Sequence, residues 1–487
     1  MRKKLFNMRN WHYILIIILN LNLCFSQSNS KYQKAISTFV NDPELANASI
    51  SISMINTKNK ELVVGYQENK SLCPASSLKI LTCAAALEVL GPSFKISTPF
   101  VLEGKKINDT SFFGDLNIIG KGDPTFASQQ MFGALNIEQI IDSVYYFLKL
   151  RNIKLISGQI HVNSDYIKDI PENPEWLWYD LGNYYGAGCF GLNLMENTAW
   201  ITLLGSYQNG ALCNIIKVYP PCLESTFCSE VTTSLNDDGE EVFILGSSKD
   251  PNHNVIGSIL CCGNDTLNLK TSISNPPATF EILLKEGLEK RGIQFQFIKH
   301  LEADHIEVLW EHKSPELIYI IERALKRSVN LYVESLVHIL GDKWYGTTNR
   351  KQALLGIVNF WKNKGIIDHG IVLKDGSGLS PKNAISSYQL ASTLLNINEN
   401  KQFQDFCELL PDASTEGALS KYFDTKKGIN KFRLKSGSME YIRSWSGYIM
   451  VDNVPQYAFS AIINHYSCSS EYLRKKMASL LNDLSKI

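Results

Sequence analysis

The chain has 487 residues, more than one ordinary hydrophobic core accommodates, so its length predicts two or three domains. Hydrophobic residues make up 44% and charged residues 20%, a balance typical of globular proteins and not of disordered chains. Lys and Arg together number 48, as do Asp and Glu, so no net charge draws the protein toward anionic lipid, and we expect no nucleic acid partner.

Residues 1–26 have the pattern of a signal peptide. A basic start precedes the apolar run at residues 13–19, and Ser26 offers a small residue for cleavage. The apolar stretch is short and contains asparagines, which disfavours a permanent membrane span. Lipid attachment at Cys24 is an alternative, although Leu23 is large where a lipoprotein signal has a small residue. We therefore predict export, to the periplasm or the exterior of the cell envelope.

The first predicted elements after this segment are a β-hairpin and a helix. Residues 48–55 alternate small or polar with apolar side chains, the polar stretch 57–60 turns the chain, and residues 61–66 return as the hairpin partner. A helix is then predicted from about Pro74 to Leu90, where the Gly-Pro pair that follows ends it.

The motif Ser76-Ser77-Leu78-Lys79 stands at the start of this helix. Helical positions three apart share a face, so the Ser76 hydroxyl and the Lys79 amine can meet. A serine hydroxyl needs a base to become a nucleophile, and a lysine amine acts as one when apolar neighbours such as Ile80 lower its pKa. Taken alone the motif is weak, because Ser28 and Lys31 have the same spacing and a solvated lysine at a helix start is the competing interpretation.

The middle of the chain, from about residue 93 to 310, has a different pattern of apolar and turn-forming residues. Short strand-like runs separated by Gly, Asn and Asp occur at residues 114–119, 158–162 and 199–204, and long helical periodicity is mostly absent from this region until residues 280–292. This pattern predicts a large strand-rich insertion.

Helical patterns return in the last third of the chain. They are found at residues 315–340, 350–364, 387–395 and 471–484, and strands are predicted at residues 432–435, 446–451 and 457–463. The economical interpretation is one helix-and-sheet domain that the strand-rich insertion divides.

A second motif, Ser328-Val329-Asn330, lies in the apolar helical region 317–340. If the chain turns there, Ser328 can relay a proton to a leaving group and Asn330 can hold a substrate amide and the lysine. A pair of polar helix residues is the competing interpretation, and Ser234-Leu-Asn236 repeats the pattern by chance.

A third motif, Lys435-Ser436-Gly437-Ser438, ends an apolar-alternating run. On an edge strand Lys435 and Ser436 can present a cation and a hydroxyl to a substrate carboxylate. Gly437 allows another backbone to lie close, so that a peptide can pair with the strand. By itself, a strand that ends in a turn explains this motif equally well.

Neither a metal nor a cofactor is predicted. The chain has no Cys-x-x-Cys pair and no His-Glu-x-x-His run, and its nine histidines are scattered. Cysteines do occur in close pairs, Cys222 with Cys228 and Cys261 with Cys262. Export would permit disulfides, but the sequence does not give their connectivity.

Together the three motifs are much more specific than any one of them. Ser-x-x-Lys, then Ser-x-Asn, then Lys-[Ser/Thr]-Gly, in this order, is the signature of class A β-lactamases and penicillin-binding proteins. Their predicted settings, a helix, a helical connection and a strand, suit that signature.

The sequence further resembles the D-alanyl-D-alanine carboxypeptidase/endopeptidase family of low-molecular-mass penicillin-binding proteins, of the class C type with inserted domains. The likeness extends from about Tyr32 to the end of the chain. The segments that carry it besides the motifs are Pro74–Thr82, Gly114-Asp-Leu116, Gly120–Pro124, Asn193, Glu196-Asn197, Asp375-Gly-Ser-Gly-Leu-Ser380, Pro411 and Gly417-Ala-Leu419. The long connection between Ser76 and Ser328 fits this family better than a class A β-lactamase.

The resemblance implies an α+β fold, a serine DD-peptidase/β-lactamase-like transpeptidase domain whose antiparallel sheet is flanked by helices, with strand-rich inserted domains. The implied divisions are a signal peptide at 1–26, a split penicillin-binding domain at 27–92 and 310–487, an inserted domain at 93–194 and 256–309, and a nested domain at 195–255.

The resemblance also implies the roles of the motif residues. Ser76 would be the acylated nucleophile, Lys79 its general base, and Ser328 and Asn330 the rest of the proton-transfer network. Residues 435–438 would bind substrate: Lys435 and Ser436 the terminal carboxylate, with Gly437 in the strand, while the backbone N–H groups of Ser76 and Ser438 form the oxyanion hole. Two departures are Val329, where the family usually has Asp or a similar residue, and Ser436, where Thr is commoner.

The implied function is a serine-type D-Ala-D-Ala carboxypeptidase/endopeptidase that acts on peptidoglycan peptides through an acyl-serine intermediate, with β-lactams as covalent inhibitors. A non-catalytic peptidoglycan-binding scaffold and a β-lactamase-like hydrolase of the same fold are the alternatives. The sequence does not fix the oligomeric state.

Overall fold

The computed structural model describes residues 31–234, 241–260, 265–297, 305–367, 369–400, 406–423 and 431–486. The predicted signal peptide lies outside these residues. The chain forms two compact units, each assembled from separate stretches of sequence. Among the described residues, the first comprises those within Met1–Ile80, Lys362–Val372 and Asn383–Ile487, and the second those within Leu81–Trp361 and Leu373–Lys382. The finer division of the insertion into two nested domains stays a prediction.

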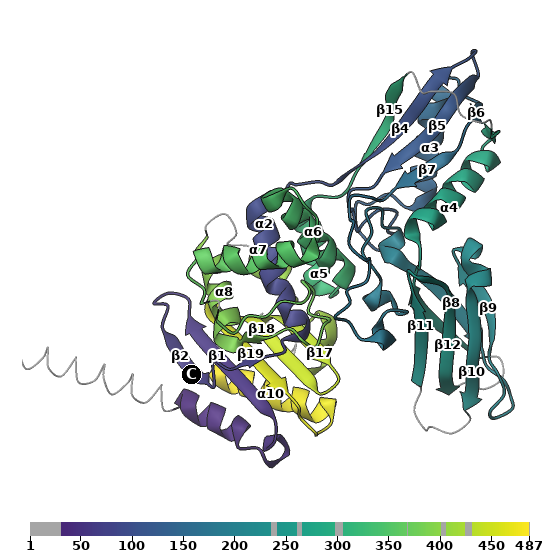
Figure 1. Cartoon of the computed structure of the whole chain (residues 1–487). Coiled ribbons are helices and arrows are strands. Elements are labelled where there is room, and N and C mark those ends of the chain that lie inside the picture. The colour runs from purple at the N-terminus through teal and green to yellow at the C-terminus, as the bar shows by residue number, and fades with distance from the viewer. Residues whose placement is uncertain are drawn as a thin grey trace, which may run out of the picture. The chain divides into compact units, whose positions relative to one another are not determined.

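The first unit is built on an antiparallel sheet of five strands in the order β17-β18-β19-β1-β2 (Figure 1). These strands are β1 (Ser49–Asn56), β2 (Leu62–Tyr66), β17 (Phe432–Met439), β18 (Ile442–Val451) and β19 (Val454–Asn464). Both the predicted hairpin and the three strands predicted near the end of the chain are therefore present, and they join in one sheet.

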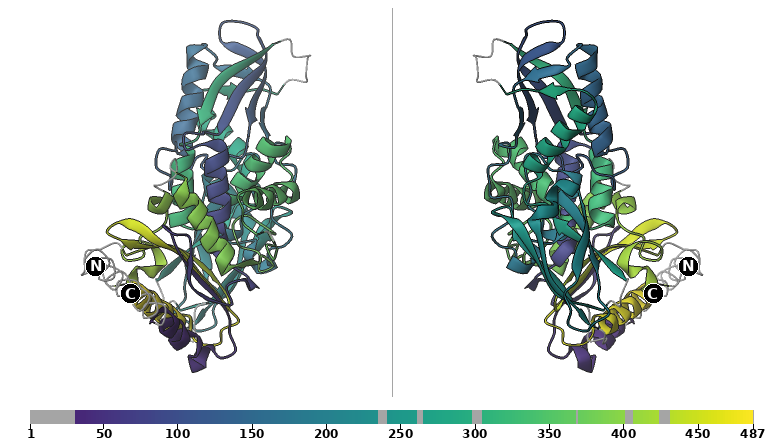
Figure 2. Two further views of the ribbon diagram at one scale, coloured as in Figure 1. Left: turned by 90° about the vertical axis from the view of Figure 1, so that its left-hand side faces the viewer. Right: turned by 90° about the vertical axis from the view of Figure 1, so that its right-hand side faces the viewer.

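Helices cover both faces of this sheet, which explains why β1 is buried throughout its centre. On one face Ile52 belongs to a core formed with α10 (Ser470–Leu484) and the helical residues 31–40, which lie side by side (Figure 2). On the other face the Ser53 hydroxyl lies 2.7 Å from the hydroxyl of Ser387, the first residue of α8 (Ser387–Glu399). The small side chains of β1 thus let α8 approach the sheet closely, whereas the sequence predicted only a half-buried strand.

Shorter elements complete the first unit. They are η1 (Pro43–Leu45), β3 (Ser71–Leu72) paired with β16 (Ile385–Ser386), η2 (Ala75–Leu78), α9 (Phe406–Leu409) and η8 (Gly417–Tyr422). The helix α2 (Lys79–Leu90) follows η2 directly and ends before Gly91, as the sequence predicted.

One sheet of the second unit has the strand order β14-β6-β5-β4-β15, with β7 also paired to β5. Its strands are β4 (Ser97–Lys106), β5 (Ser111–Ile119), β6 (Leu155–Ser157), β7 (Ile160–Asn163), β14 (Gln294–Phe295) and β15 (Ile306–Lys313). The helices α3 (Ile137–Leu150) and α4 (Pro276–Lys290) share a hydrophobic core with it. The expectation that long helical periodicity is mostly absent between residues 93 and 280 is wrong at α3.

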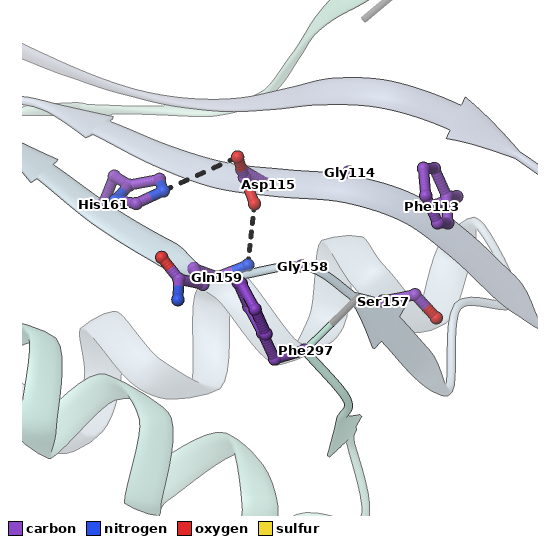
Figure 3. A pocket seen from close by; sticks show the side chains of 8 residues that line it. All are labelled: Phe113, Gly114, Asp115, Ser157, Gly158, Gln159, His161 and Phe297. Atoms are coloured by element: carbon purple, nitrogen blue, oxygen red, sulfur yellow. Dashed lines mark hydrogen bonds and ion pairs between the residues drawn. The ribbon is translucent and has the colours of Figure 1, made fainter. Parts of the chain in front are cut away.

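Asp115 organises the place where β5 meets β6 and β7. Its carboxylate accepts a hydrogen bond of 2.7 Å from the Gln159 backbone N–H and lies 3.5 Å from His161 Nε2 (Figure 3). A Cβ atom on Gly158 would lie 2.0 Å from the backbone oxygen of Gly114, so only glycine fits at position 158. The Gly-Asp-Leu segment at residues 114–116 is thus a strand junction.

Two further sheets of the second unit contain three strands each, in the orders β13-β8-β9 and β10-β12-β11, and they enclose a separate small core. Their strands are β8 (Thr198–Leu204), β9 (Asn214–Tyr219), β10 (Phe227–Ser234), β11 (Glu241–Ser247), β12 (Asp250–Leu260) and β13 (Thr266–Ser272), and η6 (Pro221–Thr226) joins β9 to β10. The strand-rich texture predicted for this region is confirmed by these elements.

The helices of the second unit include α5 (Leu317–Lys326), α6 (Asn330–Tyr345) and α7 (Arg350–Asn363), and three short turns, η3 (Trp178–Asp180), η4 (Tyr184–Gly186) and η5 (Met195–Asn197), precede β8. The sequence predicted a continuous helical region at 315–340. The structure breaks it between Lys326 and Asn330, because Ser328 has a left-handed backbone with φ of 59° that an α-helix cannot contain.

Candidate active site

Ser76 and Lys79 come together where η2 joins α2 in the first unit. Side chains three residues apart lie above one another in a 3₁₀ turn. The Lys79 Nζ donates a hydrogen bond of 2.9 Å to Ser76 Oγ, and Lys79 is completely buried, with 0% of its surface exposed. A hydroxyl and a buried amine are therefore in direct contact, the arrangement that activation of a serine requires.

Ser77 in η2 and Ser444 in β18 connect η2 to the sheet by hydrogen bonds. Ser77 Oγ lies 2.7 Å from Ser444 Oγ and donates a 3.3 Å hydrogen bond to the backbone oxygen of Lys435. Ser444 Oγ in turn donates to the backbone oxygen of Pro74. These contacts hold a turn whose first residue, Ala75, has an unfavourable left-handed backbone with φ of 45°.

Gly437 is the place where β17 lies closest to Ser76. A Cβ atom there would lie 2.9 Å from the Ser76 backbone nitrogen, 2.5 Å from the Pro74 oxygen and 2.3 Å from Ser444 Oγ. A larger residue would push the strand away from the turn. The sequence analysis predicted that Gly437 allows a peptide to lie close to the strand. In the structure, backbone atoms of Pro74 and Ser76 occupy the space where a Cβ atom of this residue would lie.

The other residues of the third motif lie along β17. Lys435 is buried and its Nζ donates a 2.7 Å hydrogen bond to the Ser436 backbone oxygen. Ser436 is half-buried, and the exposed Ser438 accepts a hydrogen bond from the Arg443 guanidinium. Burial lowers the pKa of Arg443, which also donates to Tyr466 OH at 3.0 Å. The first unit thus gathers Ser76, Lys79 and the predicted substrate-binding residues.

Ser328 and Asn330 belong to the second unit, at the turn between α5 and α6. The left-handed Ser328 separates α5 from α6, and Asn330 is the first residue of α6. The Asn330 Nδ2 donates a 2.8 Å hydrogen bond to the Tyr185 backbone oxygen. The turn that the proposed roles of Ser328 and Asn330 require is therefore present, and η4 anchors the Asn330 amide.

Glu196 connects this turn to the rest of the second unit. Its carboxylate accepts hydrogen bonds from Tyr332 OH and Ser128 Oγ, both at 2.8 Å, and from two nitrogens of Arg323 at 2.8 and 3.0 Å. Burial followed by the charge of Glu196 raises the pKa of Tyr332 well above its usual value. Since Arg323 lies in α5 and Tyr332 in α6, one carboxylate holds both helices that flank Ser328.

Two buried carboxylates organise the loop at residues 373–382 of the second unit. Asp375 accepts hydrogen bonds from the backbone of Gly378 and Ser380 and from Trp176 Nε1, at 2.5 to 2.8 Å. Glu334 accepts from the backbone nitrogens of Gly376 and Ser377. Burial, followed by the negative charge of Asp375, raises the pKa of Glu334 to about 7. The Asp375 segment is thus a hydrogen-bonded turn.

Sequence reasoning gave no role to several of these residues. The sequence analysis named Glu196 only as one of the residues that carry the family resemblance. It did not name Glu334, Tyr185 or Ser444. Their partners are far away in the sequence, so neither periodicity nor spacing carries a signal for them. Ser77 was part of the first motif, but its contact with β18 could not be read from that motif.

Other features bear on the kind of site. No cluster of His, Cys, Asp or Glu side chains suited to a metal ion occurs within the described residues. Cys222 and Cys228 are free thiols, while Cys261 and Cys262 lie outside the described part of the chain. None of the helices in that part has the length and the apolar character that a bilayer-spanning segment needs.

Comparison with known proteins relates the sequence to characterised peptidases. Residues 32–484 match the D-Ala-D-Ala carboxypeptidase 3 (S13) family. The D-alanyl-D-alanine carboxypeptidase DacB of Haemophilus influenzae is 22% identical over 90% of both chains. The D-alanyl-D-alanine carboxypeptidase of an Actinomadura strain is 23% identical over 90% of this chain and 82% of its own.

Solved structures agree with the fold described above. The crystal structure of penicillin-binding protein 4 from Haemophilus influenzae superposes with a TM-score of 0.79 at 20% identity, covering 92% of this chain and 99% of that one. A structure of the same protein complexed with a β-lactam gives a TM-score of 0.70 at 21% identity, covering 90% and 95%. The α+β fold with strand-rich inserted domains is therefore confirmed. Because the family match extends over nearly all of the described residues, the chain belongs to the D-Ala-D-Ala carboxypeptidase 3 (S13) family of serine DD-peptidases.

Proposed function

We propose that this protein hydrolyses D-alanyl-D-alanine bonds in peptidoglycan stem peptides, with Ser76 as the nucleophile and Lys79 as its general base. The enzyme class, a hydrolase of the DD-peptidase type, follows from the family. The observation that carries the residue assignment is the 2.9 Å hydrogen bond between the buried Lys79 amine and Ser76 Oγ. Burial disfavours the charged form of an amine, and a neutral amine is the form that accepts a proton.

In the acylation step Lys79 takes the proton of Ser76, whose oxygen attacks the carbonyl carbon of the penultimate D-Ala. The backbone N–H groups of Ser76 and Ser438 stabilise the oxyanion, a role that the close contact of β17 with η2 at Gly437 supports. Collapse of this intermediate breaks the C–N bond, and the leaving amine receives its proton through Ser328. Water then hydrolyses the ester and regenerates Ser76.

The remaining motif residues hold the substrate. Lys435 and Ser436 bind the terminal carboxylate through a cation and a hydroxyl. Asn330 orients the substrate amide, and its own orientation is fixed by the hydrogen bond to the Tyr185 oxygen. The same carbonyl is attacked whether the leaving group is free D-Ala or the amine of a cross-bridge, so the proposal covers carboxypeptidase and endopeptidase reactions. Digestion of purified cross-linked muropeptides will show both free D-Ala and released monomers.

A fluorescent penicillin tests the nucleophile, because a β-lactam mimics the D-Ala-D-Ala end and acylates the same serine. We expect a stable covalent label on the purified protein and none on Ser76→Ala, with an unchanged circular dichroism spectrum. In Lys79→Ala the labelling rate should fall on the order of 10²- to 10⁴-fold, the usual size of general-base catalysis. A label that persists in Ser76→Ala would identify a different nucleophile, and a label that is released rapidly would indicate a β-lactamase.

Export is the second part of the proposal, because peptidoglycan lies outside the cytoplasmic membrane. Residues 1–26 combine a basic start, an apolar run and a small residue at the expected cleavage position. Mass spectrometry of the protein isolated from its host should find a mature N-terminus at Gln27. An intact residue 1 in the functional protein would contradict export by this route.

A further inference from the structure

A pocket of about 540 Å³ in the second unit borders the Ser328–Asn330 segment. This volume lies in the range of sites that bind small molecules or parts of larger substrates. The pocket is lined by the segment 128–130, by η4 and η5, by β8 and β13, and by the turn between α5 and α6. It is therefore a formed cavity that shares residues with the second catalytic motif.

The charges of this pocket are unbalanced. Its lining contains three cations, Lys270, Arg323 and Arg327, but only one carboxylate, Glu196. The charge of Arg323 is paired with that of Glu196, to which its guanidinium donates two hydrogen bonds. Lys270 and Arg327 are exposed, and neither forms an ion pair within the residues that the structure describes. Two positive charges thus remain for a ligand.

The start of α6 adds to the positive character. Val329 is the N-cap of this 16-residue helix, and its side chain makes no capping hydrogen bond. The first N–H groups of a helix carry partial positive charge and normally receive a side-chain oxygen. In this chain the apolar Val329 lines the pocket and adds no negative charge to it.

The remaining walls suit an organic ligand rather than a bare ion. Trp200 and Tyr184 present aromatic rings, with the Lys270 Nζ 5.4 Å from the centre of the Tyr184 ring. Gln129 and Gln130 are exposed amides on another wall. A carboxylate on an apolar or peptide stem would match the cations with its charge and the rings with its stem.

We propose that this pocket is a subsite for a carboxylate-bearing part of the substrate, separate from the terminal carboxylate assigned to Lys435 and Ser436. The inference rests on the proposed function, because it takes Ser328 and Asn330 to face the reacting peptide. Its consequence is selectivity: substrates with an additional carboxylate on the acyl side of the scissile bond are processed faster than neutral ones.

The test compares two forms of one peptide that ends in D-Ala-D-Ala, carrying an Nα-succinyl or an Nα-acetyl group. For the unmodified protein we expect kcat/KM for the succinyl peptide to exceed that for the acetyl peptide by about twofold to fivefold, the size of an exposed charge interaction. The ratio should fall toward one in Arg327→Gln and as the salt concentration rises. Lys249→Gln removes an exposed lysine outside the pocket and should leave the ratio unchanged.

Val329 provides the sharpest pair of variants, because Asp and Asn have the same shape and both can cap α6, but only Asp adds a charge. Val329→Asp should abolish the preference for the succinyl peptide and Val329→Asn should keep it. Equal ratios in these two variants, or a ratio near one in the unmodified protein, would overturn the subsite. Absence of penicillin labelling in the unmodified protein would instead overturn the proposed function, and the subsite with it.

Discussion

Gly437 links the substrate-binding strand to the nucleophile turn. Because a Cβ atom at this position would overlap atoms of Pro74, Ser76 and Ser444, Gly437→Ala must move β17 away from η2. A displacement of about 1 Å in a catalytic site can cost on the order of 10²-fold in rate, and we expect that loss in the rate of penicillin labelling. Gly346→Ala is the control, since nothing lies within 4 Å of its Cβ position and its φ of 64° makes it a strained substitution outside the three motifs. It should lower stability by about 1 kcal/mol and leave labelling unchanged.

Glu334 gives the stability of the protein a pH dependence. Burial and Asp375 raise its pKa to about 7 in the folded protein, from an ordinary value of 4.5. The folded state therefore holds this proton more tightly than the unfolded state, and stability falls as the pH rises from about 4.5 to 7. Glu334→Gln is neutral at every pH and escapes this loss. Relative to the unmodified protein, its free energy of unfolding should rise by about 1–3 kcal/mol between pH 4.5 and 8, measured by urea denaturation. A difference that is the same at both pH values would contradict the assignment.

The turn between α5 and α6 shows what tertiary contacts can impose on a helical sequence. No Gly or Pro marks the break, and apolar residues continue on both sides of it, so periodicity predicted one helix. The break is held instead by Asn330 on the Tyr185 oxygen and by Glu196 on Arg323 and Tyr332, contacts between residues more than a hundred positions apart. The Ser76–Lys79 pair could be predicted because its geometry is local, whereas these supporting contacts could not.

The left-handed backbone of Ser328 leads to a paired prediction. Ser328→Gly and Ser328→Ala both remove the hydroxyl that relays the proton, so turnover of a D-Ala-D-Ala peptide should fall in both. Only glycine adopts a φ of 59° without steric cost. The Gly variant should therefore be more stable than the Ala variant by about 1 kcal/mol in urea denaturation. Equal stabilities would mean that the segment is not held in the left-handed conformation.

The helix α3 was missed for a different reason. Its start carries a signal that the sequence did contain, because Asn136 caps the helix and Gln139 completes a capping box. The apolar residues that follow face the core shared with β5 at the helical spacing. The sequence prediction followed the strand-like runs around this segment and not its capping residues and helical spacing. In the inserted region, capping residues are therefore a better guide to helices than the average composition.

The division of the chain into two units, each with a core of its own, predicts that unfolding is not a single cooperative event. Trp445 is buried in the core of the first unit, and beyond residue 30 it is the one tryptophan that this unit contains. In the protein that begins at Gln27, the fluorescence lost in Trp445→Phe therefore reports the first unit, while the fluorescence that remains reports the second. We expect the two signals to have different urea midpoints, because two cores built from different residues have no reason to be equally stable. Coincident midpoints, with a slope that matches the surface of the whole chain, would show that the two units unfold as one.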